Sequence, residues 1–183
     1  MARIKMNIKS AFILIVLVML TLAACNDAPE EEPPKAVAVA VHDGYSATLA
    51  EGIQFVQKQN YPSFIKSVTG MSYYEPLGRW SEGKNVVFTF TENLPNTFVL
   101  ELDFADTFQS NRGKEILVQV GNWKGQFVGK GDVSNNKILI NTSVPSNTIE
   151  FIIPNPLSPI ETGIGSDVRL LGLKFKRLSV LTN

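Results

Sequence analysis

The sequence predicts an all-β domain, an antiparallel β-sandwich of jelly-roll-like form with about eight strands and at most one short helix near its N-terminal end. Three observations support this fold class. Apolar and polar residues alternate over short runs, as they do in strands with one buried face. Glycine, proline and asparagine separate these runs and supply turns. Helical periodicity is scarce, and many short strands joined by turns are typical of a sandwich.

The clearest strands lie in the middle of the chain. Residues 86–90 place apolar side chains at every second position, and residues 98–104 do the same with four large ones. Asn93-Leu94-Pro95-Asn96 forms the turn between them, so the two runs are either neighbours in one sheet or cross between two sheets. We expect the remaining strands at 115–120, 125–128, 137–141, 148–153 and 172–181.

Three connecting segments carry signals of their own. Ser46 to Lys58 has a partial helical spacing of apolar residues, but Gly52 weakens a helix there, and a strand at 53–56 fits equally well. Gly121-Asn122-Trp123-Lys124-Gly125 is typical of a hairpin tip, because glycine permits positive φ. The proline-rich run 154–159 should cross one end of the sandwich, since proline cannot donate a hydrogen bond to a strand ladder.

The N-terminal residues indicate export and lipid attachment. A basic start is followed by an apolar run from Ala11 that is too short for a comfortable membrane span. Leu22-Ala23-Ala24-Cys25 closes this run and resembles the bacterial lipobox, which implies acylation of Cys25 and removal of residues 1–24. The alternative is a buried free cysteine in an uncleaved anchor.

The cleavage divides the chain into three parts: a signal peptide at 1–24, an acylated tether at 25–44 and a β-sandwich domain at 45–183. The tether is acidic and rich in proline, and its nineteen residues after the cysteine could reach roughly 60 Å when fully extended. Residues 36–41 could instead add an edge strand. Asn26 and Asp27 follow the cysteine, which resembles a signal for the periplasmic face of the outer membrane rather than the inner membrane.

Composition limits the classes of partner and of stabilising bond. After removal of residues 1–24, the chain keeps 14 basic and 17 acidic residues, a net charge of −3, which does not favour nucleic-acid binding. Cys25 is the sole cysteine, so no intramolecular disulfide can form. The fold must therefore depend on apolar burial in one domain of ordinary size.

The sequence gives little support for catalysis. The sole histidine, His42, lies in the tether, so the domain lacks the base of a Ser-His-Asp triad and a histidine ligand for zinc. Paired carboxylates could hydrolyse a glycoside, but that mechanism requires a separation that sequence alone does not provide. The candidates are Glu75, Glu101, Asp103 and Asp167. We therefore expect a protein that is not an enzyme and that uses no cofactor and no metal.

Two polar clusters are the candidate ligand-binding residues. The first holds Tyr73, Tyr74, Glu75, Arg79 and Trp80 within a few positions. Aromatic rings can cover the C–H face of a pyranose while charged groups bind its hydroxyls, so this combination favours a sugar.

The second cluster is Asp167 and Arg169, which face the same way on an extended chain and could bind a ligand together. Trp123, at the expected hairpin tip, is a further candidate, although its ring could fold back over the sheet edge. The structural alternative is that Trp80 is a core ring and that the arginines pair with Glu75 or Asp167.

A set of short motifs between about residue 49 and residue 180 carries a family resemblance. The motifs are Gly52-Ile53-Gln54-Phe55, Tyr61-Pro62-Ser63-Phe64, Gly70-Met71-Ser72, Glu75-Pro76, Gly78-Arg79-Trp80-Ser81-Glu82-Gly83, Leu94-Pro95, Ser158-Pro159 and Asp167-Val168-Arg169-Leu170-Leu171-Gly172. Together they resemble the C-terminal non-catalytic domain of phosphoglycerol transferase I, from a family that modifies periplasmic glucans. The transferase domain that would precede this module is replaced here by the signal peptide and tether, so the resemblance implies an accessory domain.

Together these observations predict a lipid-anchored envelope protein whose sandwich binds or presents a periplasmic or surface glycan. The alternative function is a protein-interaction module that docks onto a glycan-processing or envelope-assembly enzyme, with Trp123, Tyr73 and Tyr74 as its aromatic anchor. A shallow cleft lined by aromatic and polar groups would favour the sugar, whereas a flat apolar patch would favour the protein.

Overall fold

The structure is a computed structural model that describes residues 39–40 and 44–182. The predicted signal peptide, the acylation site Cys25 and the tether histidine His42 lie outside the described residues. The described strands all belong to one compact unit, Ala36–Asn183.

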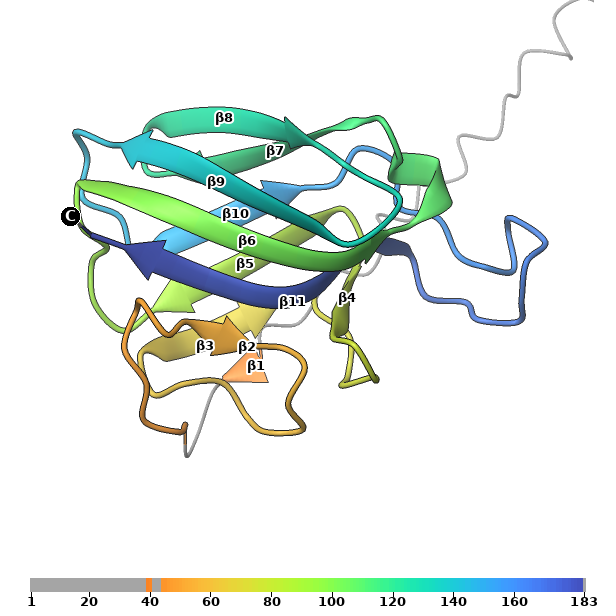
Figure 1. The fold of residues 1–183 in the computed structure, drawn as a ribbon, viewed down its shortest axis with the longest axis horizontal. Helices are drawn as coiled ribbons and strands as arrows, with labels where there is room; N and C mark the ends of the chain where they lie inside the picture. The colour runs from red at the N-terminus through yellow and green to blue at the C-terminus, as the bar shows by residue number, and fades with distance from the viewer. Residues whose placement is uncertain (1–38, 41–43, 183) are drawn as a thin grey trace, which may run out of the picture. The chain divides into compact units, whose positions relative to one another are not determined.

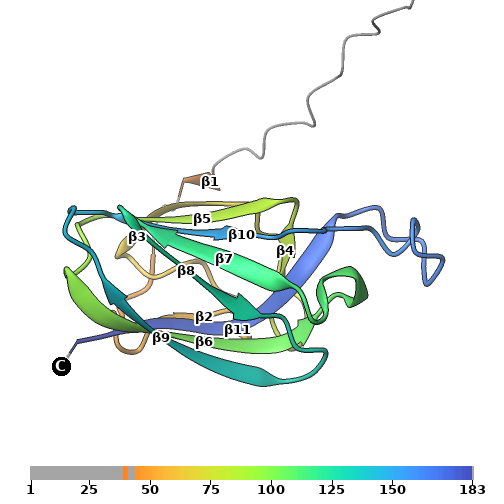
Figure 2. The same ribbon diagram turned by 90° about the horizontal axis from the view of Figure 1, so that it is seen from above.

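Eleven strands form two antiparallel sheets, which lie as two layers (Figures 1 and 2). The six-stranded sheet has, in spatial order, β1 (Val39–Ala40), β3 (Ile65–Thr69), β5 (Asn85–Phe90), β10 (Thr148–Ile152), β7 (Glu115–Val120) and β8 (Trp123–Val128). The five-stranded sheet has β2 (Ile53–Gln54), β11 (Leu171–Leu181), β6 (Thr97–Thr107) and β9 (Ser134–Asn141), with β4 (Arg79–Glu82) also paired to β11. The predicted antiparallel β-sandwich is therefore confirmed.

The chain passes repeatedly from one layer to the other. The connections β5–β6, β6–β7, β8–β9, β9–β10 and β10–β11 each join strands of different sheets. β7 and β8 are joined within one sheet by the two-residue turn Gly121-Asn122, where Gly121 has φ +56°. The predicted hairpin is thus present, with Trp123 as the first residue of β8 rather than part of the tip.

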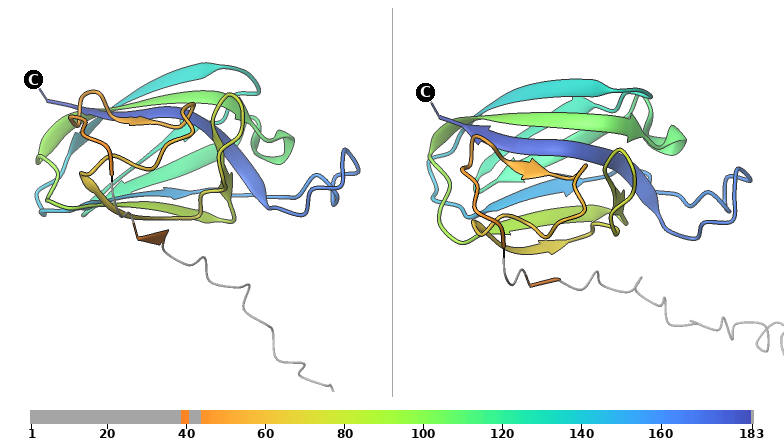
Figure 3. Two further views of the ribbon diagram at one scale, coloured as in Figure 1. Left: turned by 90° about the horizontal axis from the view of Figure 1, so that it is seen from below. Right: turned by 60° about the horizontal axis from the view of Figure 1, so that its bottom comes forward.

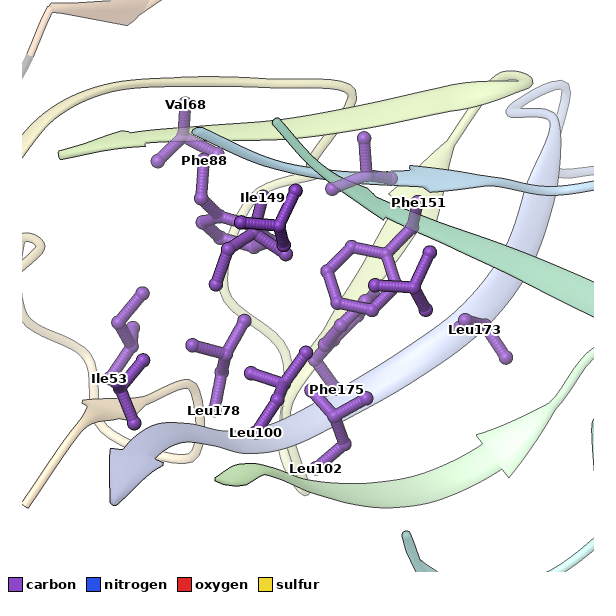
Figure 4. Close-up of a cluster of buried hydrophobic side chains, with 14 of the residues drawn as sticks. Ile53, Val68, Phe88, Leu100, Leu102, Ile149, Phe151, Leu173, Phe175 and Leu178 are labelled. Carbon is purple, nitrogen blue, oxygen red and sulfur yellow. The ribbon is translucent and has the colours of Figure 1, made fainter. Parts of the chain in front are cut away.

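The core fills the space between the layers, as Figure 4 shows. Alternation along β6 buries Phe98, Leu100, Leu102 and Phe104, in agreement with the pattern in the sequence. Phe175 of β11 lies at the centre of this core, with its ring centroid 4.9 Å from that of Phe104. Large apolar side chains with almost no exposed surface supply the main stabilisation of such a domain.

Four strands account for the differences from the expected eight: β1 and β2 lie where the sequence left alternatives open, and β3 and β4 were not predicted. The segment Ser46 to Lys58 contains turns and the two-residue strand β2, and the helix that it offered as one alternative is not formed. Gly52 has φ +73°, and a Cβ atom there would lie 2.2 Å from the carbonyl oxygen of Leu178, so the backbones approach too closely for a side chain. The edge strand left open within residues 36–41 is present as β1, which pairs with β3.

Helical structure within the described residues is limited to one 3₁₀ turn, η1 (Gln109–Asn111), between β6 and β7. In this part of the chain, no helix is long and apolar enough to cross a bilayer.

Candidate functional site

Two connections bring most of the predicted site residues to one end of the sandwich. The first is the β3–β4 connection, residues 70–78, whose tip is closed by reciprocal backbone hydrogen bonds between Glu75 and Gly78, both 3.1 Å. The second is the β10–β11 connection, residues 153–170, which projects beyond the strands (Figures 1 and 3). We call this the loop end.

Arg169 holds the two connections together. Its Nη2 lies 2.7 Å from Oε1 of Glu75 in the first connection and 2.5 Å from Oδ2 of Asp167 in its own. Its guanidinium carbon lies 4.4 Å from the centroid of the Tyr73 ring, a cation–π contact. Lys174 of β11 adds an ion pair with Glu75, with Nζ 3.4 Å from Oε2. We call these five residues the Arg169 cluster.

The charges of this cluster stabilise one another. Hydrogen bonds from the Arg169 side chain, and then from its backbone N–H, hold the pKa of Asp167 below its usual value. The hydrogen bond with Asp167, followed by that with Glu75, raises the pKa of Arg169 above its already high value, although burial opposes this. The side chains of Arg169 and Glu75 are 14% and 21% exposed, so these pairs are partly shielded from water. The Arg169 cluster therefore joins the two connections through mutually paired charges.

Trp80 and Arg79, which were predicted as part of the same site, lie in different surroundings. Trp80 lies beside the cluster, since Nζ of Lys174 is 5.5 Å from its ring centroid and Phe108 contacts it edge-on at 6.1 Å. Arg79 lies outside the Arg169 cluster. Its Nη2 donates to the carbonyl of Gln59 at 2.8 Å, and its guanidinium carbon lies 5.0 Å from the centroid of the Tyr61 ring.

Tyr74 is half-buried in the first connection. Trp123 lies on another element, at the start of β8, where it is half-buried against the core. A Cβ atom on Gly125 would be 2.4 Å from Cη2 of Trp123, so the ring covers that glycine. The ring therefore folds back over the sheet, which is the alternative that the sequence left open for this residue.

Two features of the loop end were missed by sequence reasoning. Because side chains of β11 alternate in direction, Lys174 points away from the core that Leu173 enters. Its position opposite Trp80, however, depends on the register between β4 and β11. Leu77, at the tip of the first connection, has φ +72° and a side chain that is 69% exposed. A leucine in this conformation is strained and often marks a functional position.

A surface hollow lies at the opposite end of the sandwich. It has a volume of about 350 Å³ and is formed where β5 ends. The Phe64 ring, half-buried, stacks on Phe90 with a centroid distance of 6.0 Å and an interplanar angle of 6°. We call it the Phe64 hollow, and its lining residues are Leu49, Ser63, Phe64, Phe90, Thr91, Glu92, Asn93 and Leu94.

A smaller hollow of about 170 Å³ lies on the six-stranded sheet, beside Gln119, Lys124 and Gln126. Neither hollow is lined by a residue of the Arg169 cluster. Within the described residues, no group of three or more histidine, cysteine, aspartate or glutamate side chains is placed to hold a metal ion.

A family model matches most of the chain. The family is described as a domain of unknown function, DUF7024, and the match extends over residues 40–182, which include both the loop end and the Phe64 hollow. No curated protein and no solved structure matches the chain.

Proposed function

We propose that this chain, which belongs to the DUF7024 family, is a lipid-anchored accessory protein of the bacterial envelope that binds glycan and catalyses no reaction on it. The observation that carries the proposal is the composition of the Phe64 hollow. Its lining combines two aromatic rings with polar side chains. A saccharide needs this combination, because each pyranose ring has an apolar C–H face and a periphery of hydroxyl groups.

The residues of the hollow suit a neutral sugar unit. The Phe64 ring is held in place by its contact with Phe90, which is almost fully buried. Glu92 and Asn93 are exposed on the rim and offer carboxylate and amide groups for sugar hydroxyls. The volume of about 350 Å³ is at the lower end of the range for small-molecule sites, so one or two sugar rings of a longer glycan would contact it.

The Arg169 cluster suits a sugar less well. Its carboxylates and cations pair with one another, and a hydroxyl group would have to compete with these charged partners. Tyr73 remains a second candidate for stacking, because its side chain is 66% exposed. The test below therefore includes Tyr73 as well as the hollow.

Membrane anchoring belongs to the same proposal. Acylation of Cys25 would hold the domain within the reach of the tether, so that a glycan near the membrane is met at high effective concentration. A hollow that binds glycan with low affinity, through few contacts, would then be sufficient for function.

An array of envelope glycans tests the proposal. Residues 36–183 would be applied to periplasmic glucans, peptidoglycan fragments and surface polysaccharides, because this unit contains all the described strands and core residues. Phe64→Leu keeps an apolar side chain but removes the stacking face, and Asn93→Ala removes a rim amide. We expect each change to weaken a glycan hit by about fivefold or more, the value of a lost hydrogen bond or ring contact.

Two further variants locate the site. Glu115→Ala removes an exposed carboxylate of β7, outside the hollow, and should bind like the parent. Tyr73→Ala should also bind like the parent. Loss of binding in Tyr73→Ala alone would move the site to the loop end, and the absence of any glycan hit would refute the proposed function.

A further inference from the structure

Exposed apolar side chains gather at the loop end. Seven of the twelve large apolar residues that are exposed in the described chain lie in connections at this end, so their distribution is strongly uneven. The seven are Tyr73, Leu77, Val133, Ile160, Ile164, Val168 and Leu170. Such a concentration usually marks an interaction surface, because exposed apolar groups are otherwise scattered singly.

The strained backbone at Leu77 points to the same surface. Pro76 and Leu77 are the central residues of the turn between Glu75 and Gly78, and a positive φ at the second central position normally requires glycine. Glycine would form this turn without strain, and the exposed Leu77 side chain does not enter the core. The fold therefore gains nothing from leucine here, whereas an interaction surface gains an apolar tip.

Both connections are held in place from within. Arg169 joins them through Glu75 and Asp167, and the N–H of Ile160 donates to the carbonyl of Asp167 at 3.1 Å. Near the tip of the long connection, the Glu161 carboxylate accepts hydrogen bonds from the backbone N–H and the Oγ of Ser158, at 2.7 and 2.6 Å. The apolar tips are thus presented on supported loops.

We infer that the loop end inserts its apolar tips into the interfacial region of a lipid bilayer. The tips are mainly aliphatic and stand on projecting loops, whereas the anchor residues of protein interfaces are usually Trp, Tyr and Arg in pockets. Tyr73, with its apolar ring and polar hydroxyl, is of the type enriched at the membrane–water boundary.

The direction in which the chain enters the domain favours a bilayer at this end. Val39 of β1 pairs with Val68, next to the last residue of β3, so the chain enters β1 from the loop end. Exposed charge at this end is balanced, because Glu115, Asp132 and Glu161 accompany Lys84, Lys114 and Lys130, and none of the six forms an ion pair within the described structure. Binding would therefore depend on apolar insertion rather than on attraction to anionic lipid. The inference deepens the proposed membrane anchoring, and it does not depend on the identity of any glycan.

Insertion would orient the domain. The long connection follows the end of β10, which pairs with the first residue of β5, while the Phe64 hollow lies beyond the last residue of β5. Six residues of strand separate the two by about 20 Å. With the loop end at the bilayer, the hollow would face away from it.

Vesicle binding tests this inference without the lipid anchor. Residues 36–183 would be sedimented with vesicles of phosphatidylcholine and with equimolar phosphatidylethanolamine and phosphatidylglycerol. We expect comparable binding to both kinds of vesicle, because the exposed charge at the loop end is balanced. The triple variant Leu77→Ser/Ile164→Ser/Val168→Ser should bind at least about tenfold more weakly, because each change removes an exposed apolar group.

Matched variants make the test specific. Leu139→Ser/Val144→Ser changes exposed apolar residues away from the loop end and should bind like the parent. Lys84→Gln/Lys114→Gln/Lys130→Gln keeps every apolar tip and should leave binding to the phosphatidylcholine vesicles unchanged. Thermal melting confirms that each variant is folded. Absence of parent binding to both vesicles, or equal binding by the triple variant, overturns the inference. Photo-crosslinking from residue 77 to a second copy of the chain, rather than to lipid, would also overturn it.

The outcomes separate the two proposals. Vesicle binding with no glycan hit would retain the membrane contact and refute glycan binding, whereas a glycan hit with no vesicle binding would do the reverse. Loss of both in a folded parent would refute both independently.

Discussion

The guanidinium carbon of Arg169 lies 4.4 Å from the centroid of the Tyr73 ring. The two residues belong to connections that are far apart in the sequence, and the carboxylates of Glu75 and Asp167 fix the guanidinium against the ring. An exposed tyrosine is thereby held by a charged side chain that is itself mostly buried. The arrangement makes the stability of the domain and the position of its exposed surface depend on the same arginine.

Removal of this arginine should destabilise the domain. Arg169→Ala leaves two carboxylates without their shared cation, and we expect the free energy of unfolding to fall by roughly 1–3 kcal/mol. Urea unfolding of residues 36–183 measures it. Arg112→Ala is the control, because its ion pair with Asp106 is largely exposed and should contribute less than about 1 kcal/mol. An equal effect of the two variants would contradict a special role for Arg169.

The contribution of Asp167 should depend on pH with a defined sign. The pKa of Asp167 is lowered in the folded state, first by hydrogen bonds from the Arg169 side chain. The ionised Asp167 therefore stabilises the fold at pH values above the ordinary aspartate pKa, near 4. This stabilisation is lost as the pH falls through the lower pKa of the folded state. Asp167→Asn should therefore be less stable than the parent at pH 7, and the difference should shrink in strong acid. Chemical unfolding at pH 7 and at pH 2 to 3 measures this, and a difference that persists in acid would exclude the charge as its cause.

Replacement of the strained leucine should separate stability from binding. Leu77→Gly relieves a positive φ without disturbing the core, so we expect the domain to gain up to about 1 kcal/mol, less the greater entropy of glycine in the unfolded chain. The same change removes an apolar tip and should reduce vesicle binding. Calorimetric melting and sedimentation measure the two effects. A large loss of stability would show that the Leu77 side chain supports the fold.

Replacement of the predicted acylation site should change location and not folding. Cys25→Ser removes the thiol that would carry lipid, and Cys25 lies outside the compact unit Ala36–Asn183. We expect acyl labelling to be lost and the protein to move from the membrane to the soluble fraction, with the melting temperature of the domain unchanged. Because the loop end could retain some protein at the membrane, the variant should also be combined with Leu77→Ser/Ile164→Ser/Val168→Ser. Undiminished acylation would contradict the assignment of Cys25.

Sequence periodicity predicted the long strands well, for a physical reason. β6 and β5 each have one face toward the core, so their apolar residues alternate in a way that needs no knowledge of partners. The strand β4 has no such signal, since Arg79 and Trp80 are both half-buried. Its place is set by pairing with β11, which comes about ninety positions later in the chain.

The unrecognised strand explains why the first predicted cluster divides. Arg79 and Trp80 are neighbours in β4, and successive side chains of a strand point to opposite faces. Arg79 therefore contacts Tyr61, and Trp80 contacts Phe108. By contrast, the pairing of Asp167 with Arg169 is local and follows from their spacing, whereas the addition of Glu75 and Lys174 depends on long-range register.

The position of β11 also has a consequence for how the chain reaches its final state. This last strand pairs with β2, β4 and β6, so the five-stranded sheet stays incomplete until the C-terminal residues are available. Pairings between distant segments fold slowly, and most of the chain must leave its site of synthesis before they form. A segment order of this kind delays compaction, which would suit the proposed export of the chain in an unfolded form.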